Sequence, residues 1–273
     1  MMTPLVAQGW VPKWPVASHV KAYFSTRQGG VSLSPWHSLN LGDHVGDQPA
    51  HVAANRSLLA QGIGAAPVFM KQVHGSEVLD LDAQTPHGLA ADACWTAQPG
   101  VACTIMVADC LPVLFTDAKG SWVAAAHAGW RGLAGIGMGM GLGLGVLEAT
   151  LARCLSSASI AGLVAADVQV WLGPCIGPQA FEVGAEVRAA FCAFDPAAEQ
   201  AFVPYQGTTY WADLAWLARL RLQRAGVTAI YGNDSTPAWC THTQASQFFS
   251  HRRDAAVLGT TGRMAACIWL DRG

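Results

Sequence analysis

Short apolar runs, separated by polar or glycine-rich stretches, constrain the fold of this chain more than any other feature. The runs are only four to seven residues long, which is short for a helix and typical of a β-strand. We predict strands at residues 67–73, 78–81, 101–107, 113–116, 122–126 and 168–172, and a closing strand near the C-terminus.

Segments with helical spacing are interspersed with these runs. Residues 49–62 begin with proline and end with glycine, and residues 213–225 are followed by Gly226, as expected at helix ends. Strands and helices follow no regular βαβ repeat, and no linker divides the chain. We therefore predict one domain over residues 1–273, of the mixed α/β (α+β) class, with a mixed β-sheet core flanked by helices. The other segments with helical spacing are residues 146–155 and 183–193.

Composition excludes some classes of partner. The 273 residues are 52% hydrophobic and 12% charged, with a formal net charge of −2 and no block of lysine or arginine. This argues against a nucleic-acid-binding surface, whose affinity comes mainly from neutralising phosphates. The N-terminal residues lack the basic start and apolar core of an export signal. The eight cysteines form no CxxC pair, so we expect free thiols and a cytoplasmic protein.

A second biased feature is the alternation of glycine with Ile, Met and Leu from Gly135 to Gly145. It fits neither a dinucleotide-binding loop nor a P-loop, because the required glycine and lysine positions are missing. The uncharged stretch from Gly132 to Leu147 is shorter than the roughly 20 apolar residues of a membrane span. We predict a surface loop or diluted helix start leading into residues 146–155, and no membrane partner.

Three apolar runs end or break at a residue that can bind a metal. His74 precedes Gly75, Cys110 lies before a proline, and His127 follows the run at 122–126. Two imidazoles and a thiolate are the ligands of some catalytic zinc sites, which leave a fourth position open. The separations of 36 and 17 residues match no local zinc motif, so spacing alone leaves ordinary structural roles open.

Several motifs, in order along the chain, resemble the YfiH family. This family is also called the laccase-domain or polyphenol-oxidase-like family, and the resemblance runs from about Phe24 to Arg263. It implies that His74, Cys110 and His127 are zinc ligands and catalytic residues. The glycine alternation is an insertion relative to the usual family pattern. The motifs are STRQGGVSLSPWHSLNLGDHVGD, KQVHG, DACWT, ADCLPVLFTD, AAHAGWRG, WLGPCIGP and CTH…HRRD…TGR.

The resemblance also implies a function. Family members are described as zinc-dependent purine nucleoside phosphorylases that act on adenosine, inosine and methylthioadenosine and also deaminate adenosine. The implied partners are small-molecule nucleosides and phosphate. Deamination requires hydroxide at neutral pH, which zinc supplies by lowering the pKa of water to about 7. Phosphorolysis passes through an oxocarbenium-like state, so the site must hold an anion beneath C1′ and stabilise the departing base.

Polar side chains in the same motifs are candidates for substrate contacts. Arginine binds phosphate well through its planar set of donors, although exposed arginines are more often solvated or paired. Asp92 and Asp109 either orient a ligand imidazole or cap turns. The candidates for phosphate are Arg131, Arg27 and the Arg252–Arg253 pair, and those for other substrate contacts are Asn40 and Gln72.

Three alternative functions are open at this point. A multicopper laccase requires about ten histidines with HxH pairs, whereas this chain has nine histidines and no HxH, which disfavours copper. A metal-free hydrolase, such as a peptidoglycan-editing enzyme, would use Cys110 as nucleophile with His127, or Cys175 as another thiol. The eleven tryptophans would suit a binding domain, but a chain this apolar can bury most of them.

Overall fold

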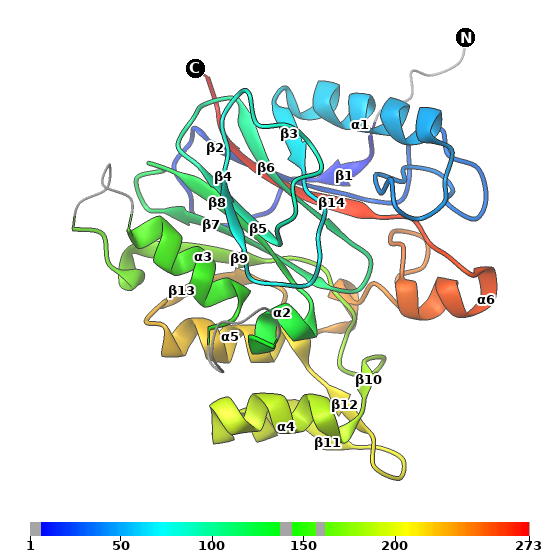
Figure 1. Ribbon diagram of the computed structural model, residues 1–273, viewed down its shortest axis with the longest axis vertical. Helices are drawn as coiled ribbons and strands as arrows, with labels where there is room; N and C mark the ends of the chain where they lie inside the picture. The colour runs from blue at the N-terminus through cyan, green and yellow to red at the C-terminus, as the bar shows by residue number, and fades with distance from the viewer. Residues whose placement is uncertain (1–6, 137–143, 157–161, 273) are drawn as a thin grey trace.

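The protein is a stack of two β-sheets between layers of helices, as the computed structural model shows (Figure 1). The structure describes residues 7–136, 144–156 and 162–272. The five-stranded sheet has the order β1 (Gly9–Trp10), β2 (Val20–Ser25), β14 (Met264–Leu270), β6 (Val101–Val107) and β3 (Ala66–Phe69). The six-stranded sheet has the order β13 (Ala229–Gly232), β9 (Val168–Leu172), β7 (Leu111–Asp117), β8 (Val123–Ala128), β5 (Ala93–Thr96) and β4 (Val78–Asp80).

Both sheets are mixed, because β3 pairs in parallel with β6, β13 with β9, and β4 with β5, whereas the other pairs are antiparallel. A small third sheet contains β10 (Glu182–Val183), β12 (Tyr210–Ala212) and β11 (Phe202–Pro204). The helices are α1 (Pro49–Ile63), α2 (Trp130–Ala134), α3 (Val146–Leu155), α4 (Ala185–Phe194), α5 (Leu214–Arg224) and α6 (Ala256–Leu258). Shorter turns are η2 (Ala165–Asp167), η3 (Pro196–Ala201), η4 (Pro237–Trp239) and the π-helical η5 (His251–Ala255).

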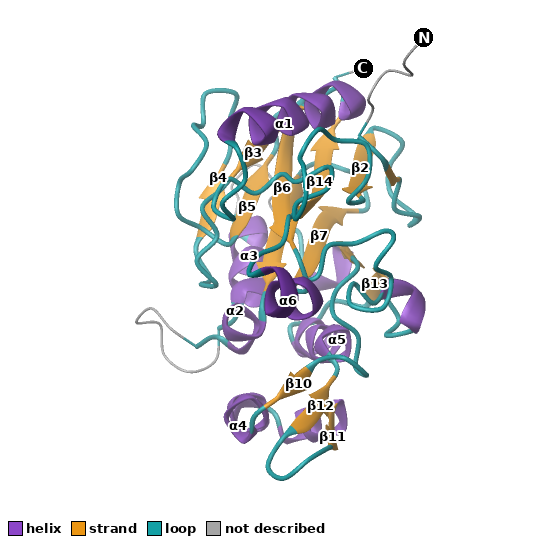
Figure 2. Ribbon diagram, turned by 90° about the vertical axis from the view of Figure 1, so that its right-hand side faces the viewer, coloured by secondary structure: helices purple, strands orange, loops and turns teal. Residues whose placement is uncertain are grey.

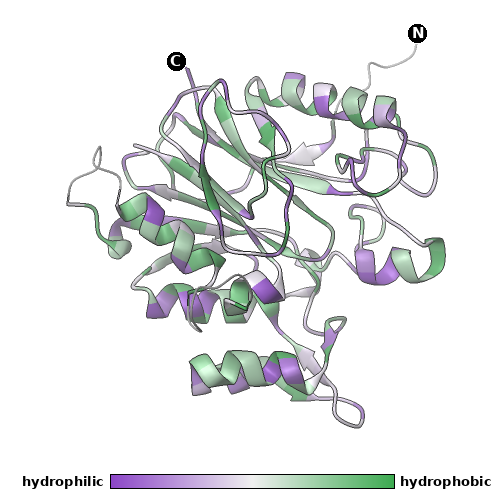
Figure 3. Ribbon diagram, in the orientation of Figure 1, coloured by the Kyte–Doolittle hydropathy of each residue, from purple (hydrophilic) through white to green (hydrophobic). Residues whose placement is uncertain are grey.

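Successive side chains of β6 alternate between two of the three core clusters. Cys103 and Ile105 pack into the layer between the two large sheets. Ala102 and Met106 point to the opposite face, into the cluster under α1. Successive side chains of a strand face opposite ways, so a strand that is apolar throughout must be covered on both sides. The same apolar character of the central strands is visible as green ribbon in Figure 3.

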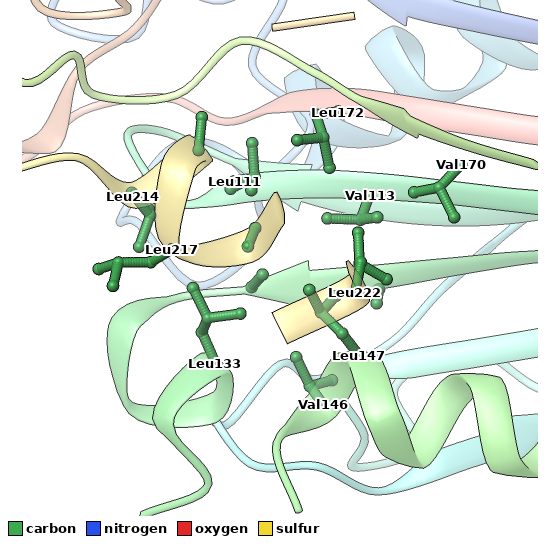
Figure 4. Packing of buried hydrophobic residues seen from close by; sticks show 14 of the residues in the cluster. Leu111, Val113, Leu133, Val146, Leu147, Val170, Leu172, Leu214, Leu217 and Leu222 are labelled. Atoms are coloured by element: carbon green, nitrogen blue, oxygen red, sulfur yellow. The ribbon is translucent and has the colours of Figure 1, made fainter. Parts of the chain in front are cut away.

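Helices α3 and α5 cover the outer face of the six-stranded sheet. Figure 4 shows Leu217 and Leu222 of α5 gathered with Leu147 of α3 and Val113 of β7. Figures 1 and 2 both place the small β10–β12–β11 sheet and α4 as a lobe beyond α5. This lobe brings Phe181 and the start of α5 towards the edge where the candidate ligands lie.

The predicted fold class is confirmed, with differences at several element boundaries. Strands β6 and β9 have the predicted bounds, and helices α1, α3, α4 and α5 lie within one or two residues of prediction. The strand predicted at 67–73 ends at Phe69, because Lys71 only forms an isolated bridge and the chain turns away. Strands β1, β2, β5 and β13 and the whole small sheet are absent from the sequence prediction.

Most of the glycine alternation, residues 137–143, lies outside the described part of the chain. On its two sides, α2 ends at Gly135 in the left-handed conformation (φ 75°) and α3 begins after Gly145. No helix within the described ranges has the length and apolar character needed to cross a bilayer.

The packing between the sheets leads to a test of stability. Ile105 is fully buried between the two sheets. We expect Ile105→Ala to lower the free energy of unfolding by about 2–5 kcal/mol, because it removes apolar contacts and leaves a cavity. The matched control is Val257→Ala, at a residue 82% exposed, with an effect of about 0.5 kcal/mol or less. Urea denaturation measures both; equal losses would contradict the two-sheet core.

Candidate metal centre and cavity

The three predicted ligands meet at one edge of the stacked sheets. His74 lies in the loop after β3, Cys110 in the turn between β6 and β7, and His127 near the end of β8. Their candidate ligand atoms all lie within 4.8 Å of one another. Cys110 Sγ is 3.8 Å from His74 Nε2, and the two imidazole centroids are 4.8 Å apart. Three distant segments therefore form one compact donor group.

Asp92 fixes the geometry of two of these ligands. Its carboxylate is fully buried and lies 2.8 Å from His127 Nδ1, which leaves Nε2 of that ring available as a ligand. The same carboxylate accepts hydrogen bonds from the backbone amides of Val73, His74 and Gly75. Burial alone would raise the pKa of Asp92, but His127 and these amides outweigh burial and lower it. Asp92 thus orients a ligand imidazole.

The group is electrostatically suited to a cation. Burial opposes ionisation of the Cys110 thiol, but His127 and His74 outweigh it and lower the pKa of Cys110 to about 6. Burial also disfavours charge on His127, yet the Cys110 thiolate and Asp92 raise the pKa of His127 to about 9. The two imidazoles thus favour the thiolate of Cys110, and a thiolate is the form that binds metals.

The glycines of the HAGWRG motif leave room for the ligands. A Cβ at Gly129 would lie 2.8 Å from His74 Cδ2 and 3.1 Å from Cys110 Sγ. A Cβ at Gly132 would lie 2.6 Å from the carbonyl oxygen of Gly75. Both glycines are required because the start of α2 packs directly against the ligand loop.

The donor set fits a metal ion. Two imidazole nitrogens and one thiolate sulfur, oriented by a carboxylate behind one imidazole, match the ligand chemistry of a three-coordinate catalytic site. The His74–Cys110–His127 group can therefore bind a metal. Its two imidazoles and one thiolate suit both zinc and copper.

Asp109 anchors another loop and makes no bond to a ligand imidazole among its described contacts. Its carboxylate accepts hydrogen bonds from the hydroxyls of Thr241 and Ser250 and from the backbone amide of Arg252. Asp109 adopts a left-handed backbone conformation, with φ 94°. Of the two roles open in the sequence, turn stabilisation therefore applies to Asp109. Asp109 thereby connects the turn that carries Cys110 to the loop that carries Arg252.

A cavity of about 350 Å³ opens over the donor group. This volume falls within the usual range of small-molecule sites. The lining is mixed, with a charged or polar part and an apolar part. It consists of His44, Gln72, His74, Met106, Val107, Ala108, Asp109, Cys110, His127, Trp130, Ile176, Phe181, Leu214, His251, Arg252 and Arg263.

Two of the predicted substrate-contact residues line this cavity. Gln72 is one, but its side-chain amide is bonded to both backbone groups of Met106. Arg252 is the other, and its guanidinium donates to the carbonyl of Glu182.

The remaining candidates lie elsewhere. Asn40 is fully buried and accepts the Arg263 backbone amide through Oδ1. Arg27 donates to two backbone carbonyls and stacks on Phe249. Arg131 stacks on Trp130 but is not itself part of the cavity lining. Cys175 is buried, and burial raises the pKa of its thiol well above the usual value.

Several residues of the cavity lining are not among the site residues predicted from the sequence. His44, His251 and Arg263 provide polar groups, and Trp130 and Phe181 provide aromatic faces. All but Phe181 lie inside motifs that carried the family resemblance, so the motifs themselves were the available signal. What the motifs lacked was any indication of which side chains point inwards.

These features define an α/β protein in which a His–Cys–His group that can hold a metal lines a cavity of small-molecule size. The chain belongs to the YfiH family: its residues 21–271 match the family described as "Multi-copper polyphenol oxidoreductase laccase". It is 48% identical to "Purine nucleoside phosphorylase YfiH" of Escherichia coli, over 95% of this chain and 98% of that protein. It is 47% identical to "Purine nucleoside phosphorylase PA4543" of Pseudomonas aeruginosa, over 95% and 97%.

A solved structure agrees with this assignment. Protein NMB0706 of Neisseria meningitidis superposes with a TM-score of 0.85 at 42% identity, covering 96% of this chain and 99% of that one. The match therefore extends over nearly the whole of both proteins.

The position of Asp92 leads to a test of metal binding. We expect Asp92→Asn to weaken Zn²⁺ binding about 10- to 100-fold, because the amide loses the charge that orients His127. Competition with a chromogenic chelator measures the affinity, and Asp82→Asn, at an exposed carboxylate, is the control. Unchanged affinity in Asp92→Asn would show that the carboxylate only holds the loop.

Proposed function

We propose that this protein is a zinc-dependent purine nucleoside phosphorylase, cleaving adenosine, inosine and methylthioadenosine, and that it also deaminates adenosine. The observation that carries the proposal is the convergence of His74, Cys110 and His127 beneath a cavity of nucleoside size. The names of the relatives support the same chemistry. The purine nucleosides and phosphate are its proposed partners.

The three ligands would hold zinc, which supplies a Lewis acid and lowers the pKa of water to about 7. Asp92 keeps His127 in the tautomer that presents Nε2. His74 is held by its own backbone amide, which donates to Asp92 at 2.9 Å. The contribution of the chain is therefore a donor set already oriented before substrate binds, which lowers the reorganisation needed during reaction.

The cavity wall supports a nucleoside substrate. Trp130, Ile176, Phe181 and Leu214 provide apolar and aromatic surface suited to the flat face of a purine. Charged and polar groups also line the cavity and would contact the ribose and phosphate. This mixed lining suits a substrate that is apolar at one end and strongly hydrated at the other.

One arrangement favours a second candidate, the metal-free hydrolase. Cys110, His127 and Asp92 form a thiolate–imidazole–carboxylate series, as in cysteine hydrolases. His74 distinguishes the two proposals, because a hydrolase has no need of a second imidazole 3.8 Å from its nucleophile. We therefore rank the metal site first.

The ligand role of His74 is tested by substitution. We expect His74→Ala to abolish phosphorolysis and deamination together while the thermal unfolding midpoint changes little, because the residue is exposed and its ring contacts the two other ligands. Base release and inosine formation from adenosine measure the two activities. The control is His19→Gln, distant from the cavity, which keeps both. Retained phosphorolysis in His74→Ala would count against the proposal.

Alkylation separates a metal ligand from a free nucleophile. With zinc bound, we expect Cys110 to resist iodoacetamide; after chelation it should react readily at pH 7, because its pKa is about 6. Cys192 is the internal control: it is half-buried and its pKa is raised, first by burial and then by Glu199. Peptide mass spectrometry follows both thiols. Equal Cys110 reactivity before and after chelation would favour the hydrolase.

A further inference from the structure

The cavity over the donor group has two chemically different walls. Arg263 immediately precedes β14, and His44 lies in the loop between β2 and α1, so both come from the layer of the five-stranded sheet. Ile176, Phe181 and Leu214 belong to the core cluster on the far side of the six-stranded sheet. Arg263 and His44 therefore reach the cavity from a different layer of the molecule than Ile176, Phe181 and Leu214 do.

Arg263 has donors to spare. Its Nη1 donates to the carbonyls of Thr261 and Gly262, at 3.1 and 3.2 Å, while Nε and Nη2 make no hydrogen bond within the described ranges. Within the described ranges, no carboxylate lies at ion-pair distance from the Arg263 guanidinium. Burial lowers the pKa of Arg263, opposed by the charges of Cys110 and Asp109, but a guanidinium remains protonated at neutral pH.

The other arginines near this end of the molecule are committed elsewhere. Arg253 is paired with the neighbouring carboxylate and bonds three carbonyls. Arg27 bonds two carbonyls and stacks on a phenylalanine. Arg252 bonds a carbonyl beside the apolar wall, and Arg131 stacks outside the lining. Of the two arginines in the lining, Arg252 lies over the Phe181 ring, whereas Arg263 lies with the polar residue His44 and has Nε and Nη2 unbonded within the described ranges.

The backbone around Arg263 holds it in place. The Arg263 amide donates to Asn40 Oδ1 at 2.9 Å, and the Leu41 amide donates to the Arg263 carbonyl at 3.1 Å. A Cβ at Gly42 would lie 2.8 Å from Arg263 Cγ, so the side-chain stem packs on a glycine. Asn40 is thus a positioning residue that acts through Arg263. An arginine fixed this way loses little entropy when it binds an anion.

His44 complements this arginine. Its Nδ1 lies 3.4 Å from Asp43 Oδ1, so a proton on Nδ1 leaves Nε2 as an acceptor. Burial, followed by the charge of Arg263, lowers the pKa of His44, which keeps the ring neutral at pH 7. A neutral imidazole beside a guanidinium matches hydrogen phosphate, which offers both anionic oxygens and one hydroxyl.

We propose that Arg263, assisted by His44, binds the inorganic phosphate that attacks the nucleoside, and that the base lies against the apolar wall of Phe181. This proposal rests on the proposed phosphorylase function. A phosphate oxygen forms a bond to C1′ as the C1′–N9 bond breaks, and its electron pair leaves with N9. The hydrogen phosphate proton ends on the base, so the products are the neutral base and ribose 1-phosphate.

Substitution of Arg263 tests the site through phosphate itself. We expect Arg263→Gln to raise the KM for phosphate about 10- to 100-fold, because charge-assisted hydrogen bonds are lost. Phosphate-independent deamination of adenosine and zinc content should stay within about twofold in the same preparation. Calorimetric titration of the zinc-loaded protein with inorganic phosphate should show a matching loss of affinity. His44→Gln should give a smaller loss of the same kind.

Controls separate this site from the proposed function. Arg188→Gln removes an exposed, paired arginine on α4 and should leave all four measurements unchanged. The wild type could bind phosphate without catalysing phosphorolysis, while Arg263→Gln binds none. That result would support the phosphate site at Arg263 and contradict the proposed phosphorylase function. Unchanged phosphate affinity in folded Arg263→Gln or His44→Gln overturns the site, as does a wild type that binds no phosphate. Thermal unfolding shows which variants are folded.

Discussion

The buried carboxylate of Asp92 is the interaction on which the site depends. It lies just before β5, yet it holds the loop that follows β3 and the imidazole near the end of β8. Four hydrogen bonds converge on two oxygens in a dry environment, where each is stronger than in water. Asp92 thus fixes the ring of His127 directly and the position of His74 through the backbone of its loop.

The two-sheet architecture explains why ligands so distant in sequence meet. Strands β6 and β7 belong to different sheets, and Cys110 lies in the turn where the chain passes from one sheet to the other. His127 lies on the strand beside β7, paired opposite Pro112, so antiparallel pairing brings it to the same edge. The donor group is therefore located where the layers join, and the loops of both layers can extend over it.

The sequence predicted the parts of this structure that local pattern determines. Predominantly apolar runs such as β6 and β9 were predicted at their true bounds, because strands that are covered on both faces carry few polar residues. β2 was missed because it contains exposed Lys21, and β5 because Ala93 and Cys94 have little strand preference. The ligands followed from motif resemblance and not from spacing. Which arginine faces the cavity depends on tertiary contacts, so Arg263 gave no local signal.

The missing side chains at Gly129 and Gly132 have a consequence for redesign of this centre. Any Cβ there would intrude on His74, Cys110 or the Gly75 carbonyl, so this flank has no volume in which to introduce a fourth protein donor. Engineering a closed, purely structural coordination sphere would have to use other residues of the cavity lining, such as the exposed His44 and His251. Because the start of α2 leaves no space for a fourth protein donor on this flank, it keeps the centre open to incoming molecules.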